Sequence, residues 1–177
     1  MADTKISALT EATTLAATDE FVVASSGATE RVTLATLRSE FAVWASYTPA
    51  LTGSVSDPTL GTGSSVVGRW MRLGDLGIVF ARINFGTSGT AAGSGNYRIS
   101  LPFTVGASQI TIQGGLTILE DNSASDAFSA AGYGIAGQAY AQMYLAQATT
   151  TGLVTHAVPF AWAANDIIAA TIICEIA

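Results

Sequence analysis

The sequence contains a single histidine and a single cysteine, which limits the catalytic mechanisms open to it. A Ser-His-Asp mechanism would have to use His156, and no Gly-x-Ser-x-Gly nucleophile motif accompanies it. His156 precedes the strand-like run 157–160. We expect it to be a hydrogen-bonded strand or loop residue. Cys174 ends the apolar run 172–174, a pattern that favours a small core or interface residue over a nucleophile. We therefore expect no catalytic residues and no enzyme activity.

An acidic group in the second half of the chain is the one candidate for metal binding. Glu120, Asp121 and Asp126 flank Asn122, and Ca²⁺ prefers such carboxylate and amide oxygens. Their spacing matches no EF-hand, so the preferred interpretation is a solvated loop tip, and no metal ion is expected. A glycosidase pair of carboxylates is a further, weaker alternative.

Phosphate and nucleic-acid binding are disfavoured by both motif and charge. Gly61, Gly63 and Gly68 precede neither a lysine nor a helix start, unlike a phosphate-binding loop, so we expect them to lie in turns and at strand edges. The seven basic residues are spread singly along a chain of net charge −6, whereas a nucleic-acid groove needs clustered Lys and Arg. We expect no cofactor and no nucleic acid.

Aromatic residues offer a different kind of binding chemistry, because ring faces stack on the apolar faces of sugars. At strand positions most of them are expected in a core or a subunit interface. If several are exposed, they could form a sugar-binding platform; the candidates are Trp70, Tyr97, Tyr133, Tyr140, Tyr144 and Trp162.

The composition indicates a chain whose surface is partly covered by other chains. Only 11% of the residues are charged, while 49% are hydrophobic. A free monomer normally carries more surface charge. We interpret the chain as an oligomer subunit; the alternative is a monomeric, secreted Thr/Ser-rich β protein.

No targeting or membrane segment is expected. The N-terminus lacks the basic segment and apolar stretch of a signal peptide, and apolar runs such as 167–174 are too short to span a bilayer. The chain is therefore expected to be made in a cytoplasm, without membrane insertion.

The first 46 residues differ in texture from the rest and hold six of the thirteen acidic residues. Short strands are predicted at 21–24 and 31–33, around a turn at 25–27. Thr33 is a candidate N-cap for a helix over 34–43. Arg38 interrupts the apolar stripe of this helix, so the helix would bury only a narrow face. So small a hairpin and helix cannot bury enough apolar area alone, so this module needs a partner.

From residue 47 onward the chain reads as short strands separated by Gly, Ser, Asn and Pro. The number of strands and the absence of a strong helix predict an all-β head domain over 47–177, of the β-sandwich or jelly-roll type. The expected strands cover 47–52, 65–73, 77–85, 96–101, 109–119, 132–139, 141–146, 156–159 and 166–175.

Two stretches carry a resemblance to a known class of proteins. Residues 5–9, 12–23 and 29–37 together resemble the N-terminal attachment segment of many tailed-bacteriophage fibre and appendage proteins. Ala17 stands where a glycine is common in that segment, and Ala24 departs from it after the strand. Residues 47–52, 58–61, 68–76, 82–86 and 162–166 are similar to a β-rich domain of phage tail and virion proteins.

The resemblance implies a structural subunit of a bacteriophage virion, similar to a short tail fibre or head fibre. Such proteins are trimers on the particle surface, with the N-terminus held by tail or capsid proteins and the β domain outward. Within residues 1–46, the apolar anchors expected to dock on the virion are Ile6, Leu9, Leu15, Phe21, Val23, Leu34 and Leu37. Two alternatives stay open: a capsid decoration protein, and a receptor-binding adhesin that recognises a host surface glycan.

Overall fold

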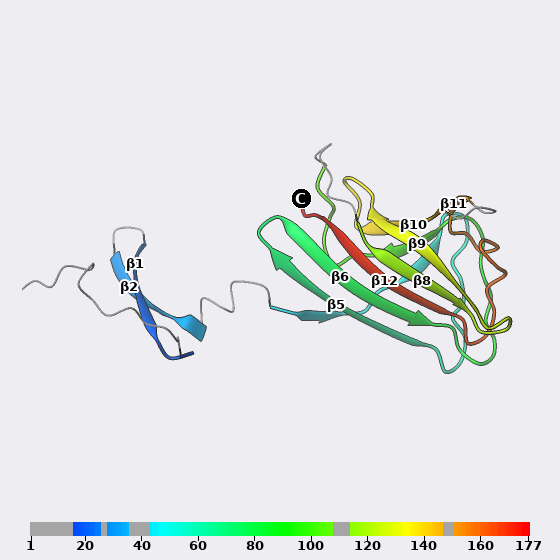
Figure 1. Ribbon diagram of the computed structural model, residues 1–177, viewed down its shortest axis with the longest axis horizontal. Helices are drawn as coiled ribbons and strands as arrows, with labels where there is room; N and C mark the ends of the chain where they lie inside the picture. Colours follow the sequence, from blue (N-terminus) through cyan, green and yellow to red (C-terminus); the bar gives the residue numbers. More distant parts are fainter. Residues whose placement is uncertain (1–15, 26–27, 36–42, 108–113, 147–150) are drawn as a thin grey trace, which may run out of the picture. The chain divides into compact units, whose positions relative to one another are not determined.

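The computed structural model describes residues 16–25, 28–35, 43–107, 114–146 and 151–177 (Figure 1). Within these ranges the chain is all-β, and helical backbone is confined to Leu34 and Ala35. The chain divides into two compact units, Met1–Val43 and Trp44–Ala177. We call them the N-terminal unit and the β unit, and each is described by itself.

The N-terminal unit contains one antiparallel hairpin. Strand β1 (Glu20–Ser25) pairs with β2 (Ala28–Thr33) from Glu20 opposite Thr33 to Ser25 opposite Ala28. Arg31 forms a 2.9 Å ion pair with Glu20, and both side chains are exposed, so the pair contributes little stability. The hairpin matches the sequence-based prediction. The predicted helix over 34–43 is not confirmed, because residues 36–42 lie outside the described ranges.

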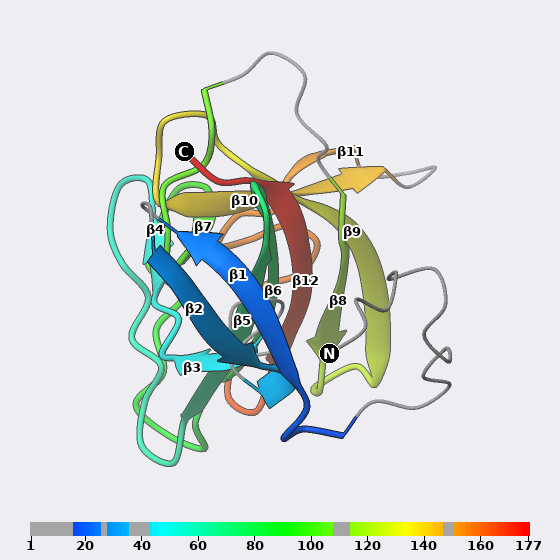
Figure 2. The ribbon, with the colours of Figure 1, turned by 90° about the vertical axis from the view of Figure 1, so that its left-hand side faces the viewer.

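The described part of the β unit forms one curled antiparallel sheet. Along the sheet the strand order is β3-β5-β6-β12-β8-β9-β10-β7-β4, and β11 pairs with β10 beside this path. In Figure 2 β10 runs across the direction of β6 and β12, as expected of a sheet that curls over its own core. The expectation of a sandwich or jelly roll is not confirmed. The strands are β3 (Ala45–Tyr47), β4 (Leu51–Gly53), β5 (Ser65–Leu73), β6 (Leu76–Asn84), β7 (Tyr97–Ser100), β8 (Leu116–Asp121), β9 (Asp126–Gly134), β10 (Tyr140–Ala146), β11 (Thr151–Leu153) and β12 (Ile167–Glu175).

The core lies inside the curl and follows the two-residue period of the strands. In β12 every second residue from Ile168 to Cys174 is buried, and the residues between them are only partly buried. In β6 and β10 the same alternation buries Val79, Ala81, Ile83, Ala141, Met143 and Leu145. One face of each strand therefore forms the core, and the other forms the outer surface of the curled sheet.

Two glycines let β9 pass close to β12. A Cβ atom at Gly132 would lie 3.2 Å from the Ile172 side chain, and one at Gly134 would lie 2.8 Å from Val105. The Cys174 sulfur would be 3.2 Å from the same Gly134 position. Because neither glycine carries a side chain that would push β9 away from its neighbours, the sheet can curl tightly around the core.

An aromatic cluster centred on Trp162 forms part of the core. Trp162 is 5% exposed, and its ring centre lies 4.5 Å from that of Phe160, 5.5 Å from that of Tyr97 and 5.6 Å from that of Phe85. The Trp162 indole nitrogen donates to the Thr155 carbonyl at 2.9 Å. The Tyr97 hydroxyl donates to the Ala92 carbonyl at 2.7 Å, so these buried polar atoms are satisfied.

Three sequence-based strand predictions are wrong, and of a fourth, 109–119, residues 109–113 lie outside the described ranges while β8 begins at Leu116. The run 47–52 is split between β3 and β4, which lie at opposite ends of the sheet order, because the intervening Pro49 has no N–H for a ladder. The sequence predicts a strand at 132–139, but the strand found there, β9, runs from Asp126 to Gly134. The run 156–159 is a turn held by a Thr155–Val158 bridge, rather than a strand.

Candidate functional site

The residues that could do covalent or metal chemistry form no site in the described structure. His156 is exposed in a turn. Cys174 is fully buried, and burial raises its thiol pKa to about 11, so it is a core residue as expected. No three of the described His, Cys, Asp or Glu side chains gather closely enough to hold a metal ion.

The acidic group around Asn122 has a structural role. Asp121 is buried and accepts hydrogen bonds from the Ser123 hydroxyl at 2.6 Å and from the backbone nitrogens of Ser123 and Ala124. The hydrogen bond from the Ser123 side chain lowers the Asp121 pKa most. Asp126 is exposed. The tip of the loop, Asn122 to Asp126, is exposed as expected from the sequence, whereas the Asp121 carboxylate is turned toward the β8–β9 turn and shapes it.

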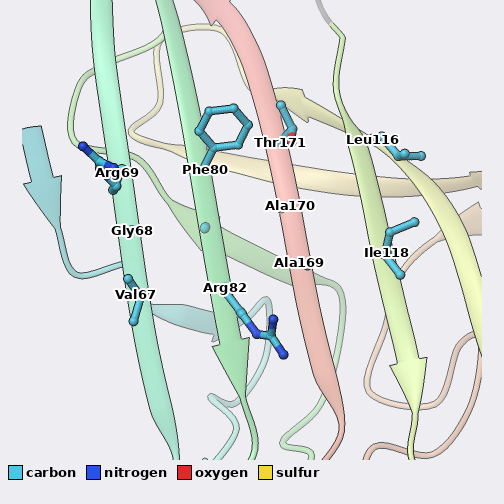
Figure 3. Close-up of a pocket in the computed structure, with 11 residues that line it drawn as sticks. Val67, Gly68, Arg69, Phe80, Arg82, Leu116, Ile118, Ala169, Ala170 and Thr171 are labelled. Atoms are coloured by element: carbon cyan, nitrogen blue, oxygen red, sulfur yellow. The ribbon is translucent and has the colours of Figure 1, made fainter. Parts of the chain in front are cut away.

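A shallow apolar groove lies on the outer face of β5, β6, β12 and β8 of the β unit (Figure 3). It has a volume of about 390 Å³. Its floor is β12 from Ala169 to Thr171, where the outward side chains of Ala169 and Thr171 are small and leave the space open. Figure 3 shows Phe80 of β6 on one side of this floor and Ile118 of β8 on the other. We call it the β12 groove.

Large apolar side chains border the β12 groove without being buried. Val67 is 61% exposed, Leu116 is 58% exposed and Phe80 is 45% exposed. The register places Arg82 between Val67 and Ala169, so a positive charge lies within this apolar border. Exposed apolar surface on a folded protein is a candidate interaction site.

Trp44 extends the apolar border toward the β3 edge of the sheet. Its ring centre lies 5.1 Å from that of Phe80, and the Arg69 guanidinium carbon lies 5.7 Å from the Trp44 ring centre. These two contacts hold Trp44 against the outer face of β5 and β6. The border therefore combines aliphatic, aromatic and cationic groups.

A second outer surface lies on β7, β10 and β9 and is rich in tyrosine. Tyr140, Gln142 and Tyr144 alternate along β10 with the buried residues Ala141, Met143 and Leu145, so they share the outer face. The ladders place Arg98 of β7 and Tyr133 of β9 on either side of Gln142. We call these five residues (Arg98, Tyr133, Tyr140, Gln142 and Tyr144) the tyrosine surface.

Contacts within the tyrosine surface link its members. The Arg98 guanidinium carbon lies 4.7 Å from the centre of the Tyr140 ring. The Tyr133 hydroxyl donates to the Gln142 side-chain oxygen at 3.3 Å. Burial, together with the electrostatic effect of Tyr144, raises the pKa of Tyr133. The surface is thus a connected group of rings and polar atoms.

The six aromatic residues singled out in the sequence divide into two groups. Tyr97 and Trp162 are buried in the core, and Trp70 packs beside Phe103 with ring centres 5.6 Å apart. The other three, Tyr133, Tyr140 and Tyr144, belong to the tyrosine surface, and Tyr144 is 43% exposed.

Only part of the expected virion-docking group can be located. Phe21 is partly buried in β1, Val23 pairs with Glu30, and the Leu34 nitrogen donates to the Asp19 carbonyl at 2.8 Å. These three residues therefore lie on or beside the hairpin. The remaining anchors lie outside the described residues; they are Ile6, Leu9, Leu15 and Leu37.

The β12 groove was not anticipated from the sequence, because its residues come from strands far apart in the chain. The tyrosine surface has a sequence signal in the strict alternation of β10, which sorts Tyr140 and Tyr144 onto the face opposite Met143. That alternation could have separated these tyrosines from the buried aromatics.

Comparisons with known proteins found no matching family model, no matching curated protein and no matching solved structure. Within the described ranges, no helix has the length and apolar character of a membrane span.

Proposed function

We propose that this chain is a self-associating structural subunit of a bacteriophage virion, similar to a short tail fibre or head fibre. The β unit would form a trimer, and residues 1–46 would dock the assembly on tail or capsid proteins. The proposed role is binding, without catalysis.

The exposed apolar border of the β12 groove is the observation that carries the self-association proposal. Val67, Phe80 and Leu116 present large apolar side chains to solvent in an isolated chain. Covering this face removes apolar area from water, and each Å² removed stabilises the assembly by roughly 25 cal/mol. The low share of charged residues, 11% of the chain, supports the same conclusion.

The charges on this face favour a second copy of the chain as the occupant. Arg82 and Glu120 lie on the same outer face, on either side of β12, with Glu120 opposite Ile167 and Arg82 opposite Ala169. A surface that carries both signs beside an apolar centre can complement a copy of itself.

The hairpin of the N-terminal unit supports the docking part of the proposal. Its two six-residue strands are too small to be stable by themselves, so a partner surface is needed to complete them. We expect that partner to be a virion protein, because segments 5–9, 12–23 and 29–37 resemble phage attachment segments. In a trimer, three attachment segments would bind the virion together, so segments that each bind weakly would bind strongly through avidity.

Size-exclusion chromatography with light scattering tests self-association through two variants of the groove border. Phe80→Ser and Leu116→Ser each replace an exposed apolar side chain, so both are expected to fold and to lower the oligomeric state. Val55→Ser is the matched control, because Val55 is 79% exposed in the loop after β4, outside the groove lining. Oligomers that survive both groove substitutions would refute the assignment of this interface.

Docking is tested on particles of the phage that encodes the chain. We expect mass spectrometry of purified virions to detect the chain, and immunogold labelling to place the β unit on an outer appendage. Labelling spread over the capsid lattice would favour the decoration alternative, and absence from the virion would refute the proposal.

A further inference from the structure

We propose that the tyrosine surface binds an oligosaccharide, with an acidic sugar facing Arg98. This inference concerns the outer face of β7, β10 and β9 and goes beyond the structural role proposed above. It does not depend on self-association, and the tests below keep the two apart.

The three tyrosines provide ring surface spread over the width of two strands. Tyr140 and Tyr144 are four residues apart on one face of β10, which separates them by roughly 13 Å along the strand. Tyr133 lies opposite Gln142, between them on the neighbouring strand β9. This spread suits a chain of two or three sugar units better than a single ring.

A hollow beside Tyr144 continues the surface. It has a volume of about 400 Å³ and is lined by Gly115, Leu116, Ser129, Ala130 and Ala131 as well as Tyr144. Apart from Leu116, which also borders the β12 groove, these residues are small, so the Tyr144 ring stands at the margin of an open depression. A sugar stacked on Tyr144 would have room here.

Two nitrogen groups of the surface have no hydrogen-bond acceptor among the described residues. The Arg98 Nε is buried and has no hydrogen-bond partner there, and Arg98 forms no ion pair with a described residue. The Gln142 amide nitrogen likewise donates to no described residue. Guanidinium and amide groups suit the hydroxyl and carboxylate groups of a sugar.

The charge of Arg98 is the reason to expect an acidic sugar. The tyrosine surface holds one cation and no carboxylate, while the chain as a whole is acidic, with a net charge of −6. A neutral saccharide would leave the Arg98 guanidinium without an anion. A carboxylate on the sugar would complement it with charge-assisted hydrogen bonds.

The chemistry of the tyrosine surface differs from that of the β12 groove. The groove border consists mainly of aliphatic and aromatic carbon, as a protein interface requires. The tyrosine surface instead alternates rings with hydroxyl, amide and guanidinium groups, and its neighbours in the ladders include Thr52 and Ser100. Sugars present the same alternation of apolar faces and hydroxyl groups.

An immobilised array of defined oligosaccharides, neutral and acidic, tests the proposal on the fluorescently labelled full chain. We expect binding to a subset of spots that carry an acidic sugar. Titration of the strongest of these oligosaccharides in solution then gives a dissociation constant. Tyr140→Ala and Tyr144→Ala should each weaken it about tenfold, which corresponds to about 1.4 kcal/mol.

Conservative variants separate the ring from the hydroxyl and the charge from the side-chain stem. Tyr144→Phe keeps the ring and should retain most of the affinity. Arg98→Gln should lower affinity for the acidic oligosaccharide more than for its neutral counterpart. Equal losses for both oligosaccharides would overturn the acidic-sugar assignment.

Light scattering of every variant distinguishes this proposal from the assembly proposal. The tyrosine variants should keep the oligomeric state of the unmodified chain, and Phe80→Ser should keep affinity for the oligosaccharide at each binding site. An array without binding, or binding that survives both tyrosine-to-alanine changes, would refute the saccharide site. Loss of the oligomer in Tyr144→Ala would assign the surface to a subunit interface instead.

Discussion

The buried carboxylate of Asp166 accepts a hydrogen bond from the backbone nitrogen of Asn122 at 3.0 Å. Its second oxygen accepts from the Ala163 nitrogen at 2.6 Å. Through these two bonds, one side chain ties the start of β12 to the turn between β8 and β9. Burial raises the pKa of Asp166, because its charged form is removed from water.

Removing this carboxylate should destabilise the β unit. Asp166→Ala leaves two backbone N–H groups without their acceptor, at a cost of about 2–4 kcal/mol in the free energy of unfolding. Urea denaturation followed by tryptophan fluorescence measures the loss. Asp126→Ala is the control, because Asp126 is exposed at the end of the same hairpin. Equal stability of the two variants would contradict the role of Asp166.

The pH dependence of stability should reveal the hydrogen bonds at Asp121. The Ser123 hydroxyl lowers the Asp121 pKa below its ordinary value of 3.8, so the unfolded state binds the proton more readily. The bonds therefore contribute stability above about pH 4, which is lost as the pH falls through the folded pKa. Ser123→Ala should be less stable than the unmodified chain at pH 7, and the difference should shrink on acidification. A difference that stays constant with pH would argue against this linkage.

The curl of the sheet should depend on the absence of a side chain at Gly134. A methyl group there would lie 2.8 Å from the buried Val105 side chain, so Gly134→Ala should cost about 1–3 kcal/mol through overpacking. Gly114→Ala is the matched change, because an added Cβ there meets no atom of the described residues within 4 Å. Thermal unfolding should separate the two variants, and a Gly134→Ala protein as stable as the unmodified chain would mean that the Val105 side chain can move aside.

The Cys174 thiol should be inert while the protein is folded. It is buried and its pKa is raised to about 11, so at pH 8 the reactive thiolate is scarce and shielded from reagent. A disulfide reagent such as DTNB should label the chain only after urea unfolding. Rapid labelling of the folded protein would show that β12 opens readily.

The strands that can be located best from the sequence have one apolar and one polar face, or are bounded by clear turns. The predicted strand at 65–73 coincides with β5, and that at 166–175 starts one residue before β12. Strand β9 escapes prediction because its residues are mainly Ala, Ser and Gly, with Phe128 and Tyr133 its only large side chains. Its place is determined by close packing against Ile172, which involves a distant segment.

The surfaces are harder to foresee than the strands, because they depend on strand order. Phe80 and Leu116 border one groove because β12, the last strand in the chain, lies between β6 and β8. No local pattern specifies that insertion. Tyr144 could be assigned to an outer face from alternation alone, but its proximity to Tyr133 requires the β9–β10 pairing.

The central claim is that the chain associates with itself through the β12 groove. Sedimentation velocity of the full chain over a range of concentrations tests it most directly. We expect a species with three times the chain mass of 18.1 kDa, and its dissociation by Phe80→Ser and Leu116→Ser but not by Val55→Ser. A folded monomer at all concentrations, unaffected by the groove substitutions, would contradict the claim.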